Sequence, residues 1–145
     1  LNEKYNEDIR LFVPLGDSKL CIKSVDSRRE LRQVIKEGSR HDLLRGAAGK
    51  VILTYMKESD RRRILTDGFD LSFIPEVLQQ GYALSIGERE GGLCGISVPI
   101  LDLNDHLCGA VSMSGPTVRF ENSSLDEKIR DMVAMSQRIH KAWIL

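Results

Sequence analysis

Small and bulky residues alternate between Gly81 and Gly115, and this pattern constrains the fold more than any other feature of the chain. Alternation with a period of two indicates strands, while glycines and short polar runs mark the turns between them. We therefore expect three strands, at Tyr82–Glu88, Leu93–Leu101 and Leu107–Ser114. All three are expected to belong to one antiparallel sheet.

The last two of these strands give the sheet two unlike faces when their register gathers the small residues together. Side chains along a strand point to opposite faces in turn, so a slip of one residue would exchange the faces. The favoured register places on one face Leu93, Gly95, Ser97, Ala110, Ser112 and Ser114. The other face then holds Cys94, Ile96, Val98, Ile100, Leu107, Val111 and Met113. The bulky face can pack a core, whereas the small, hydroxyl-bearing face leaves room for a small polar ligand.

Ahead of this region the sequence predicts further strands of the same sheet. Ile9–Leu15 and Lys19–Ser24 are apolar-rich runs around Gly16-Asp17-Ser18, a pattern typical of a hairpin. Leu31–Ile35 is a third candidate strand, which Gly38 ends. Together with the three strands above, these runs predict an antiparallel sheet of about six strands.

Two helices are predicted in the middle of the chain. His41–Met56 carries apolar residues at helical spacing, and its glycine and alanine residues would let the helix approach closely whatever it covers. A short helix is expected over Asp60–Leu65, with Ser59 as its cap and Gly68 as its stop.

Two more helices are predicted nearer the C-terminus, which makes the domain α+β with helices packed against an antiparallel sheet. Phe73–Gln80 is expected to end at Gly81. Ser124-Leu125-Asp126-Glu127 matches a capping box, which predicts the start of a long helix. The apolar stripe of that helix is expected in the core and consists of Leu125, Ile129, Met132, Val133, Ile139 and Trp143.

The charge balance argues against nucleic-acid binding by this segment. Lys plus Arg number 21 and Asp plus Glu number 21, so the formal net charge is zero, whereas a nucleic-acid-binding domain carries a basic excess. The cluster Arg61-Arg62-Arg63 is better explained as a solvated helix face. No apolar run approaches the ~20 residues that span a bilayer, and no signal peptide is visible, so a cytoplasmic location is expected.

Neither a metal site nor a cofactor is predicted. The three cysteines lack metal-ligand spacing, so reduced thiols are the simplest interpretation of Cys21, Cys94 and Cys108. The three histidines are widely separated and form no HxxxH pattern, which argues against zinc at His41, His106 and His140.

Cys94 is the one candidate nucleophile, because it lies among glycines in a segment that looks partly exposed. A nucleophilic cysteine needs a base and an orienting group nearby, and the favoured register turns Cys94 toward the bulky face, where an inert buried thiol is the simpler interpretation. Ser112 and Ser114 lack the GxSxG pattern and suit holding ligand oxygens or filling a tight strand contact. Ser85 lies on the strand leading into the loop, and Glu88 is either an exposed loop charge or one that closes over an entrance.

The chain resembles the C-terminal effector-binding domain of IclR-type bacterial transcriptional regulators. Three blocks carry the resemblance in the family's order: GSRHDLLRGAAGKVILTYM, GYALSIGEREGGLCGISVPI and HLCGAVSMSGP. It covers essentially the whole chain and implies a GAF-like fold that binds a small metabolite, often a carboxylate or an aromatic acid. It also implies a homodimer or homotetramer in which an N-terminal winged helix-turn-helix domain, absent here, binds DNA. Residues 1–7 would then end a linker helix, and residues 8–145 would form the effector-binding domain.

The resemblance carries several of the family's binding residues onto this chain. The Gly/Ala pair at the start of the family's helix falls on Ala47 and Ala48. The paired serines of the last strand fall on Ser112 and Ser114, and an apolar pocket residue corresponds to Leu93.

Two positions depart from the family's pattern. The family's pocket cysteine falls on Gly95, with Cys94 one place away, and an aspartate that some members use falls on Ser85. These departures remove a thiol and a carboxylate and enlarge the pocket. The expected ligand-binding residues are Ala47, Ala48, Ser85, Leu93, Gly95, Ser112 and Ser114, with Cys94 and Glu88 as further candidates.

We therefore expect a sensor domain and not an enzyme. It would bind a small organic or aromatic acid between the small-residue face and the helix of residues 47–56, and modulate DNA binding by the absent domain. The alternative is a small cytosolic enzyme on a GAF fold that uses Cys94 as a nucleophile or redox thiol. A third interpretation is a dimerisation module without a ligand, which a filled interior beside Gly95 would favour.

Overall fold

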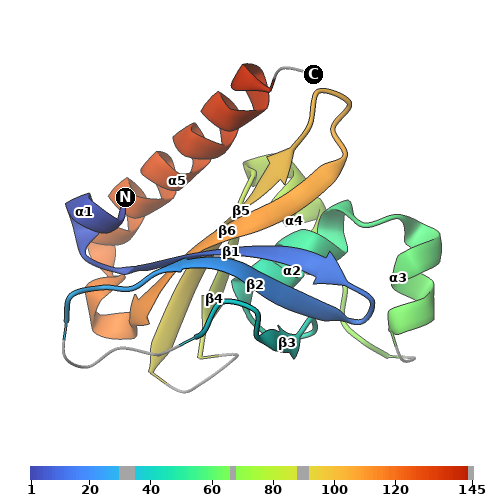
Figure 1. The fold of residues 1–145 in the computed structure, drawn as a ribbon, viewed down its shortest axis with the longest axis horizontal. Coiled ribbons are helices and arrows are strands. Elements are labelled where there is room, and N and C mark those ends of the chain that lie inside the picture. The colour runs from blue at the N-terminus through green and yellow to red at the C-terminus, as the bar shows by residue number, and fades with distance from the viewer. Residues whose placement is uncertain (30–34, 66–67, 88–91, 144–145) are drawn as a thin grey trace.

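One antiparallel sheet forms the centre of the chain, and the computed structural model describes residues 1–29, 35–65, 68–87 and 92–143. The strand order is β3-β2-β1-β6-β5-β4 (Figure 1). The strands are β1 (Asp8–Leu15), β2 (Ser18–Val25), β3 (Arg40–Asp42), β4 (Ala83–Ile86), β5 (Leu93–Leu101) and β6 (Leu107–Pro116). The helices are α1 (Asn2–Tyr5), α2 (Gly46–Tyr55), α3 (Glu58–Ile64), α4 (Phe73–Gln80) and α5 (Asn122–Ala142), with a 3-10 turn η1 (Thr117–Arg119). The α+β class and the antiparallel sheet are as predicted.

The register of β5 and β6 is the one that residue volume favours. Gly95 lies opposite Ser114 and Ser97 lies opposite Ser112, so these four residues share one face of the sheet. The bulky residues pair on the other face, Ile96 with Met113 and Val98 with Val111. The volume argument therefore predicts the two faces correctly over most of these strands.

Leu107 is the exception, and its predicted place on the bulky face is wrong. The register shifts between Ile100 and Leu101, so that Ile100 pairs with Gly109 but Leu101 pairs with Leu107. One extra residue in a strand reverses the face that the following side chains take. Leu107 consequently packs against the core cluster under α2.

The first two strands form the predicted hairpin, but the third strand differs from the prediction. β1 and β2 pair from Ile9 with Val25 to Leu15 with Ser18, and Gly16 in the turn has φ 61°, which favours glycine. The predicted strand at Leu31–Ile35 falls mostly outside the described residues. The third strand described is β3, which pairs with β2 and takes Arg40–Asp42 into the sheet.

Because Arg40–Asp42 forms a strand, the next helix begins later than the sequence predicts. α2 begins at Gly46 and not at His41. Its small residues do allow the close approach that was predicted, because a Cβ added at Gly49 would overlap the carbonyl oxygen of Leu43. The preceding chain therefore lies directly against the first turns of α2.

Two predicted helix caps are wrong and one helix is as predicted. α3 begins at Glu58, so Ser59 lies inside it, and the acidic first turn suits the positive end of the helix dipole. α5 begins at Asn122, so Ser124 lies in its first turn and donates a hydrogen bond to the carbonyl oxygen of Arg119 at 3.3 Å. α4 spans Phe73–Gln80 and ends at Gly81, whose φ is 84°.

Helices cover both faces of the sheet and produce two cores (Figure 1). The bulky face packs under α5, and the predicted stripe contributes Leu125, Ile129, Met132 and Val133 to that core. The small-residue face lies under α2, whose core includes Phe12, Leu43, Ala47, Val51, Ile52 and Ala110. The site predicted from the sequence therefore lies between α2 and the sheet, on the face away from α5.

Candidate functional site

A small cavity lies between the small-residue face of the sheet and the first turn of α2. Its volume is about 50 Å³, and its walls come from β1, β2, α2, β4, β5 and β6. The lining brings together all seven residues that the sequence predicts for ligand binding, namely Ala47, Ala48, Ser85, Leu93, Gly95, Ser112 and Ser114. Cys94 also borders the cavity, and Glu88 lies outside the described residues.

Strand register and helix packing explain why these distant residues meet. Gly95 on β5 lies between Ser85 on β4 and Ser114 on β6, so the three form one row across the sheet. A Cβ added at Gly95 would lie 3.8 Å from the Cβ of Ala47, which places α2 directly over this row. The absence of a side chain at Gly95 therefore keeps the cavity open.

The serine hydroxyls are oriented by a chain of hydrogen bonds. Ser97 Oγ donates to the carbonyl oxygen of Val111 at 3.1 Å, and Ser112 Oγ donates to Ser97 Oγ at 3.1 Å. Ser112 thus retains lone pairs that can accept a hydrogen bond. Ser114 Oγ accepts from Arg10 Nη1 at 3.0 Å, so its own hydroxyl hydrogen can be donated. The floor of the cavity offers both an acceptor and a donor.

Two buried cations that were not predicted also line the cavity. Arg10 and Lys19 are each 2% exposed. Arg10 lies 3.1 Å from the carboxylate of Asp8, while Lys19 Nζ donates to the carbonyl oxygen of Arg45 at 2.7 Å. Lys19 Nζ also lies 5.3 Å from the ring centre of Phe12. Arg10 lies two residues before the core residue Phe12, on the same face of β1. That spacing is the sequence signal that could have identified Arg10 as a buried residue.

Cys94 is poorly suited to nucleophilic attack. It is 2% exposed and belongs to the core under α5. Burial raises the pKa of the Cys94 thiol to about 11, although Lys128 acts in the opposite direction. The thiolate is the reactive form, so very little of it exists near neutral pH. In the described part of the chain, no disulfide joins Cys21, Cys94 or Cys108.

Metal ligation and membrane insertion find no support in the part of the chain that the structure describes. Within those residues, no group of three or more His, Cys, Asp or Glu side chains could hold a metal ion. Nor is any helix there long and apolar enough to cross a membrane.

A wider groove of about 840 Å³ lies beyond the opposite end of α2. Tyr55 and Met56 form its wall there, together with the tip of the β1–β2 hairpin, α3 and the β5–β6 turn. Its rim carries the exposed charged residues Lys57, Arg63 and Asp105. Because such a surface is readily solvated, its size alone does not make it a ligand site. The small cavity has the buried polar groups that a specific site requires.

A buried carboxylate organises the opposite end of the molecule from this groove. Glu7 is 0% exposed, and Arg119 binds it through Nε at 2.9 and 3.0 Å and through Nη2 at 2.6 Å. Arg29 and Lys128 approach the same carboxylate at 3.6 and 3.7 Å. We call these four residues the Glu7 cluster. Burial lowers the pKa of Lys128, and Glu7 opposes that shift.

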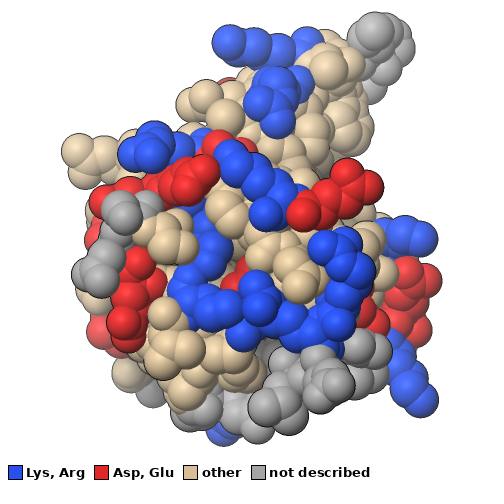
Figure 2. Space-filling model, turned by 90° about the vertical axis from the view of Figure 1, so that its left-hand side faces the viewer, with Lys and Arg blue, Asp and Glu red and all other residues tan. Residues whose placement is uncertain are grey.

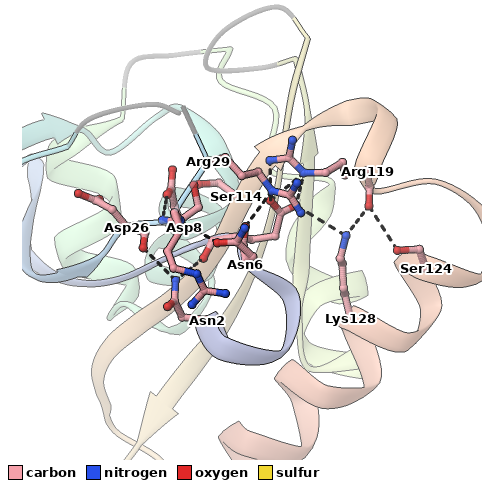
Figure 3. Close-up of polar contacts among 12 residues, drawn as sticks. Asn2, Asn6, Asp8, Asp26, Arg29, Ser114, Arg119, Ser124 and Lys128 are labelled. Carbon is pink, nitrogen blue, oxygen red and sulfur yellow. Dashed lines mark hydrogen bonds and ion pairs between the residues drawn. The ribbon is translucent and has the colours of Figure 1, made fainter. Parts of the chain in front are cut away.

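The Glu7 cluster lies next to the chain that follows α1 (Figure 3). Asn2 in α1 donates from Nδ2 to the carbonyl oxygen of Glu7 at 2.9 Å. Asp8, the next residue, accepts from the backbone of Ser27 at 2.7 Å and pairs with Arg10 in the cavity lining. On this side of the molecule Lys and Arg side chains form a band with acidic residues at its margins (Figure 2). Glu7, which precedes β1, and Asp8, the first residue of β1, therefore connect α1 to the lining of the cavity.

Solved structures share this fold. The C-terminal domain of a transcriptional regulator from Vibrio cholerae superposes with a TM-score of 0.83 at 30% identity, covering 95% of this chain and 88% of that one. The C-terminal domain of Escherichia coli KdgR superposes with a TM-score of 0.81 at 27% identity, covering 97% of this chain and 89% of that one. The class that the fold defines is a GAF-like regulatory domain.

Sequence comparison identifies the family. Residues 1–141 match the model for the bacterial transcriptional regulator IclR C-terminal domain. The chain is 31% identical to the HTH-type transcriptional regulator KdgR of Escherichia coli K12, over 93% of this chain and 55% of the relative. It is 28% identical to the HTH-type transcriptional regulator BhcR of Paracoccus denitrificans, over 86% of this chain and 50% of the relative.

This chain belongs to the IclR family of transcriptional regulators and corresponds to their C-terminal domain. It spans about half the length of the curated relatives it matches. Those relatives are named as regulators, so the domain is regulatory and not an enzyme. The family resemblance predicted from the sequence is confirmed.

Proposed function

We propose that this domain is the metabolite sensor of a cytoplasmic IclR-type regulator. It binds a small organic or aromatic acid in the cavity between the small-residue face and α2. Binding modulates the DNA affinity of an N-terminal winged helix-turn-helix domain that lies outside this chain. In this proposal residues 1–7 are the end of the linker helix, and the protein acts as a homodimer or homotetramer.

The main support is that the residues assigned by family resemblance line one cavity although they are far apart in the chain. Ala47 and Ser114, for example, come from the covering helix and from the central strand β6. A patch of small residues that only filled a tight packing contact would leave no cavity. Here the space beside Gly95 is open and carries hydroxyl groups.

The lining suits an acid. α2 has no side-chain hydrogen bond at its N-cap, Arg45, and the first N–H groups of a helix have no partner within the helix, which suits an anion. A negative charge near a helix N-terminus gains typically 0.3–1 kcal/mol, and more when the site is partly buried. Ser112 and Ser114 supply the hydrogen bonds that orient the rest of the ligand.

The cavity volume of about 50 Å³ holds one or two water molecules, each of which takes roughly 30 Å³ in the liquid. An organic acid needs more room, so binding requires α2 and the sheet to separate or the lining to move. A ligand shifts a conformational equilibrium only through different affinities for the two states. The ligand would therefore favour a wider state, which makes its binding a conformational signal.

The contacts from Arg10 through Asp8 and Glu7 to α1 offer a route for that signal. Arg10 contacts Ser114 in the cavity and also pairs with Asp8. Asp8 directly follows Glu7, whose carbonyl oxygen is held by Asn2 of α1. A ligand that moves Arg10 would change the restraint on the segment through which we propose that the linker arrives.

Exposed apolar residues on the β1–β2 hairpin support self-association. Leu15, Ile22 and Val25 are 38%, 44% and 43% exposed. Leu15 lies at the tip of the hairpin and Val25 at its open end, so exposed apolar surface runs along the whole hairpin, and such surface is a feature of contacts between proteins. We propose that a second copy covers this hairpin in the homo-oligomer.

A thermal-shift screen of small carboxylic and aromatic acids tests the proposed function. The melting temperature of the domain should rise with at least one acid. The Ser112→Ala/Ser114→Ala double variant should fold but lose that rise, because the hydroxyls that hold ligand oxygens are gone. Ser59→Ala, on the exposed face of α3, is the matched control and should respond like the unsubstituted domain. No response to any acid, or an unchanged response in the double variant, would refute the proposal.

A further inference from the structure

The Glu7 cluster lines a second pocket, of about 340 Å³, which is separate from the cavity under α2. Its walls come from α1, η1 and α5, and Lys128 on α5 points toward Arg119 (Figure 3). Two residues of α1, Lys4 and Tyr5, also line it. Among the described residues, the linings of the pocket and of the cavity have no member in common.

The described lining of this pocket carries more positive than negative charge. Its one acidic residue is Glu7, and its basic residues are Lys4, Arg29, Arg119 and Lys128. Lys4 is balanced on α5, because its Nζ lies 3.1 Å from Glu127 and 2.7 Å from Asp131. Even when Arg29 is left out, Arg119 and Lys128 share the single carboxylate of Glu7. The charge balance therefore favours a further negative group.

Arg119 and Lys128 also have hydrogen-bond donors to offer. Among the described residues, Arg119 uses Nε and Nη2 for Glu7 and donates no hydrogen bond from Nη1. A guanidinium presents five N–H groups in a fixed fork, which matches the geometry of phosphate oxygens. Lys128 is 4% exposed and donates to the carbonyl oxygen of Arg119, which leaves N–H groups of the ammonium for another acceptor.

The positive charges of the Glu7 cluster also repel one another. Burial lowers the pKa of Lys128 most, Glu7 opposes that shift, and the charges of Arg119 and Arg29 lower the pKa further. An anion beside Lys128 would offset the repulsion, because an opposite charge within a few ångströms favours the charged form. A dianion would do so more strongly than a monocarboxylate, since the attraction scales with charge.

We propose that this pocket is a second ligand site, which takes a phosphate group as inorganic phosphate or as the phosphomonoester of a small metabolite. Arg119 donates to phosphate oxygens through Nη1, and Lys128 supplies a point charge beside them. Because Lys4 and Tyr5 belong to α1, a phosphate bound here also holds α1 against α5.

Titrations of the domain with inorganic phosphate and with glycerol 3-phosphate test this site by thermal shift and calorimetry, at an ionic strength held constant with chloride. Both compounds should raise the melting temperature in a saturable way, whereas the general effect of excluded salts does not saturate. Acetate should bind more weakly than either. In Lys128→Met the affinity for phosphate should fall by roughly tenfold, as expected for a lost charge-assisted hydrogen bond, and Lys128→Arg should retain most of it.

Two control variants locate the response. Lys141→Met removes an exposed lysine from the last turn of the same helix and should bind phosphate like the unsubstituted domain. The Ser112→Ala/Ser114→Ala double variant should also bind phosphate normally, because its substitutions lie in the other cavity. Should Lys128→Met not fold, the loss of affinity is measured in Arg29→Met, whose side chain is 38% exposed in the unsubstituted domain.

The proposal is overturned if neither phosphate compound gives a saturable response, or if acetate binds as tightly as phosphate. It is also overturned if the lysine variant keeps the full affinity while the serine variant loses it, which would place the phosphate in the cavity under α2. A short DNA duplex is added as a competitor. Displacement of phosphate by the duplex more readily than by glycerol 3-phosphate would assign the pocket to a nucleic-acid backbone and not to a small metabolite.

Discussion

Arg10 Nη1 donates a hydrogen bond to Ser114 Oγ at 3.0 Å, while Nη2 of the same side chain lies 3.1 Å from the carboxylate of Asp8. One buried residue of β1 therefore contacts both Ser114 in the cavity and Asp8, the first residue of the same strand. Energetic coupling between two sites requires an element whose arrangement both sites can bias. The Arg10 side chain meets that requirement, since a ligand oxygen that accepts from the Ser114 hydroxyl would act on the same oxygen that Arg10 contacts.

We predict that Asp8→Asn separates ligand binding from the response to it. Asp8 is 4% exposed and does not line the cavity, so the substitution leaves the ligand contacts in place while weakening the pair with Arg10. In a full-length regulator, the ligand should still bind, but its effect on operator affinity should fall. The measurement is operator binding with and without ligand, beside calorimetry of the ligand. An unchanged ligand effect on operator affinity would show that the signal takes another route.

We predict that Glu7→Gln lowers the free energy of unfolding by about 3 kcal/mol. The substitution leaves Arg119, Arg29 and Lys128 around a site without a carboxylate, and breaking a buried ion pair typically costs about 3–5 kcal/mol. Urea unfolding measures the change. Glu58→Gln is the matched control, because its pair with Arg62 is exposed on α3 and, together with the lost helix-dipole interaction, should cost no more than about 1 kcal/mol. Equal effects of the two substitutions would contradict the structural role of Glu7.

We predict opposite outcomes for alanine at two glycines of neighbouring strands. A Cβ at Gly95 would meet Ala47 at an ordinary 3.8 Å, so Gly95→Ala should change stability by less than about 1 kcal/mol while narrowing the cavity. A Cβ at Gly109 would lie 2.8 Å from the backbone oxygen of Phe12, so Gly109→Ala should destabilise by about 1–3 kcal/mol. Unfolding and ligand titration of both variants provide the measurement. Unchanged ligand affinity in Gly95→Ala would place the binding site elsewhere.

We predict that Cys94 reacts more slowly with iodoacetamide than Cys108. Both pKa values are raised by burial, but Cys94 is almost fully buried and its pKa reaches about 11, whereas Cys108 is only partly buried. Compared with a thiol of pKa 9.0, the thiolate fraction of Cys94 at neutral pH is lower by roughly 100-fold. Mass spectrometry after timed labelling measures the order. Faster labelling of Cys94 would revive a nucleophilic role.

The same shift predicts a pH dependence of stability. The unfolded thiol ionises near pH 9, whereas the folded thiol keeps its proton until about pH 11. The unfolded state therefore binds fewer protons in this window, and the free energy of unfolding should fall as pH rises through it. Cys94→Ala should flatten that fall, which urea unfolding at a series of pH values would reveal.

Residue volume alone predicts much of the architecture. Gly95, Ser97, Ser112 and Ser114 could be assigned to one face because only one register of β5 and β6 separates small from bulky residues. Periodicity could not foresee the bulge that turns Leu107 to the α2 side, because a bulge depends on the pairing of the two strands. It also could not foresee that Arg40–Asp42 pairs with β2, since three polar residues carry no alternation.

The cavity was predicted less completely than the sheet. Family resemblance supplied Ala47 and Ser85, which composition and periodicity do not single out. Arg10 and Lys19 were missed because charged residues on strands are normally assigned to the solvent face. Their burial follows from the phase of β1 and β2, in which Phe12 and Cys21 point to the core. In related sequences, an Arg or Lys two residues from a core residue of the same strand would therefore indicate a buried cation.

The central claim is that the space between α2 and the small-residue face is the effector site. The most direct test is a crystal structure of the domain grown with the acid that raises its melting temperature most. Ligand density is expected beside Gly95, with an oxygen of the acid at Ser112 or Ser114. Density for that acid at another place, with the cavity beside Gly95 unchanged, would contradict the account.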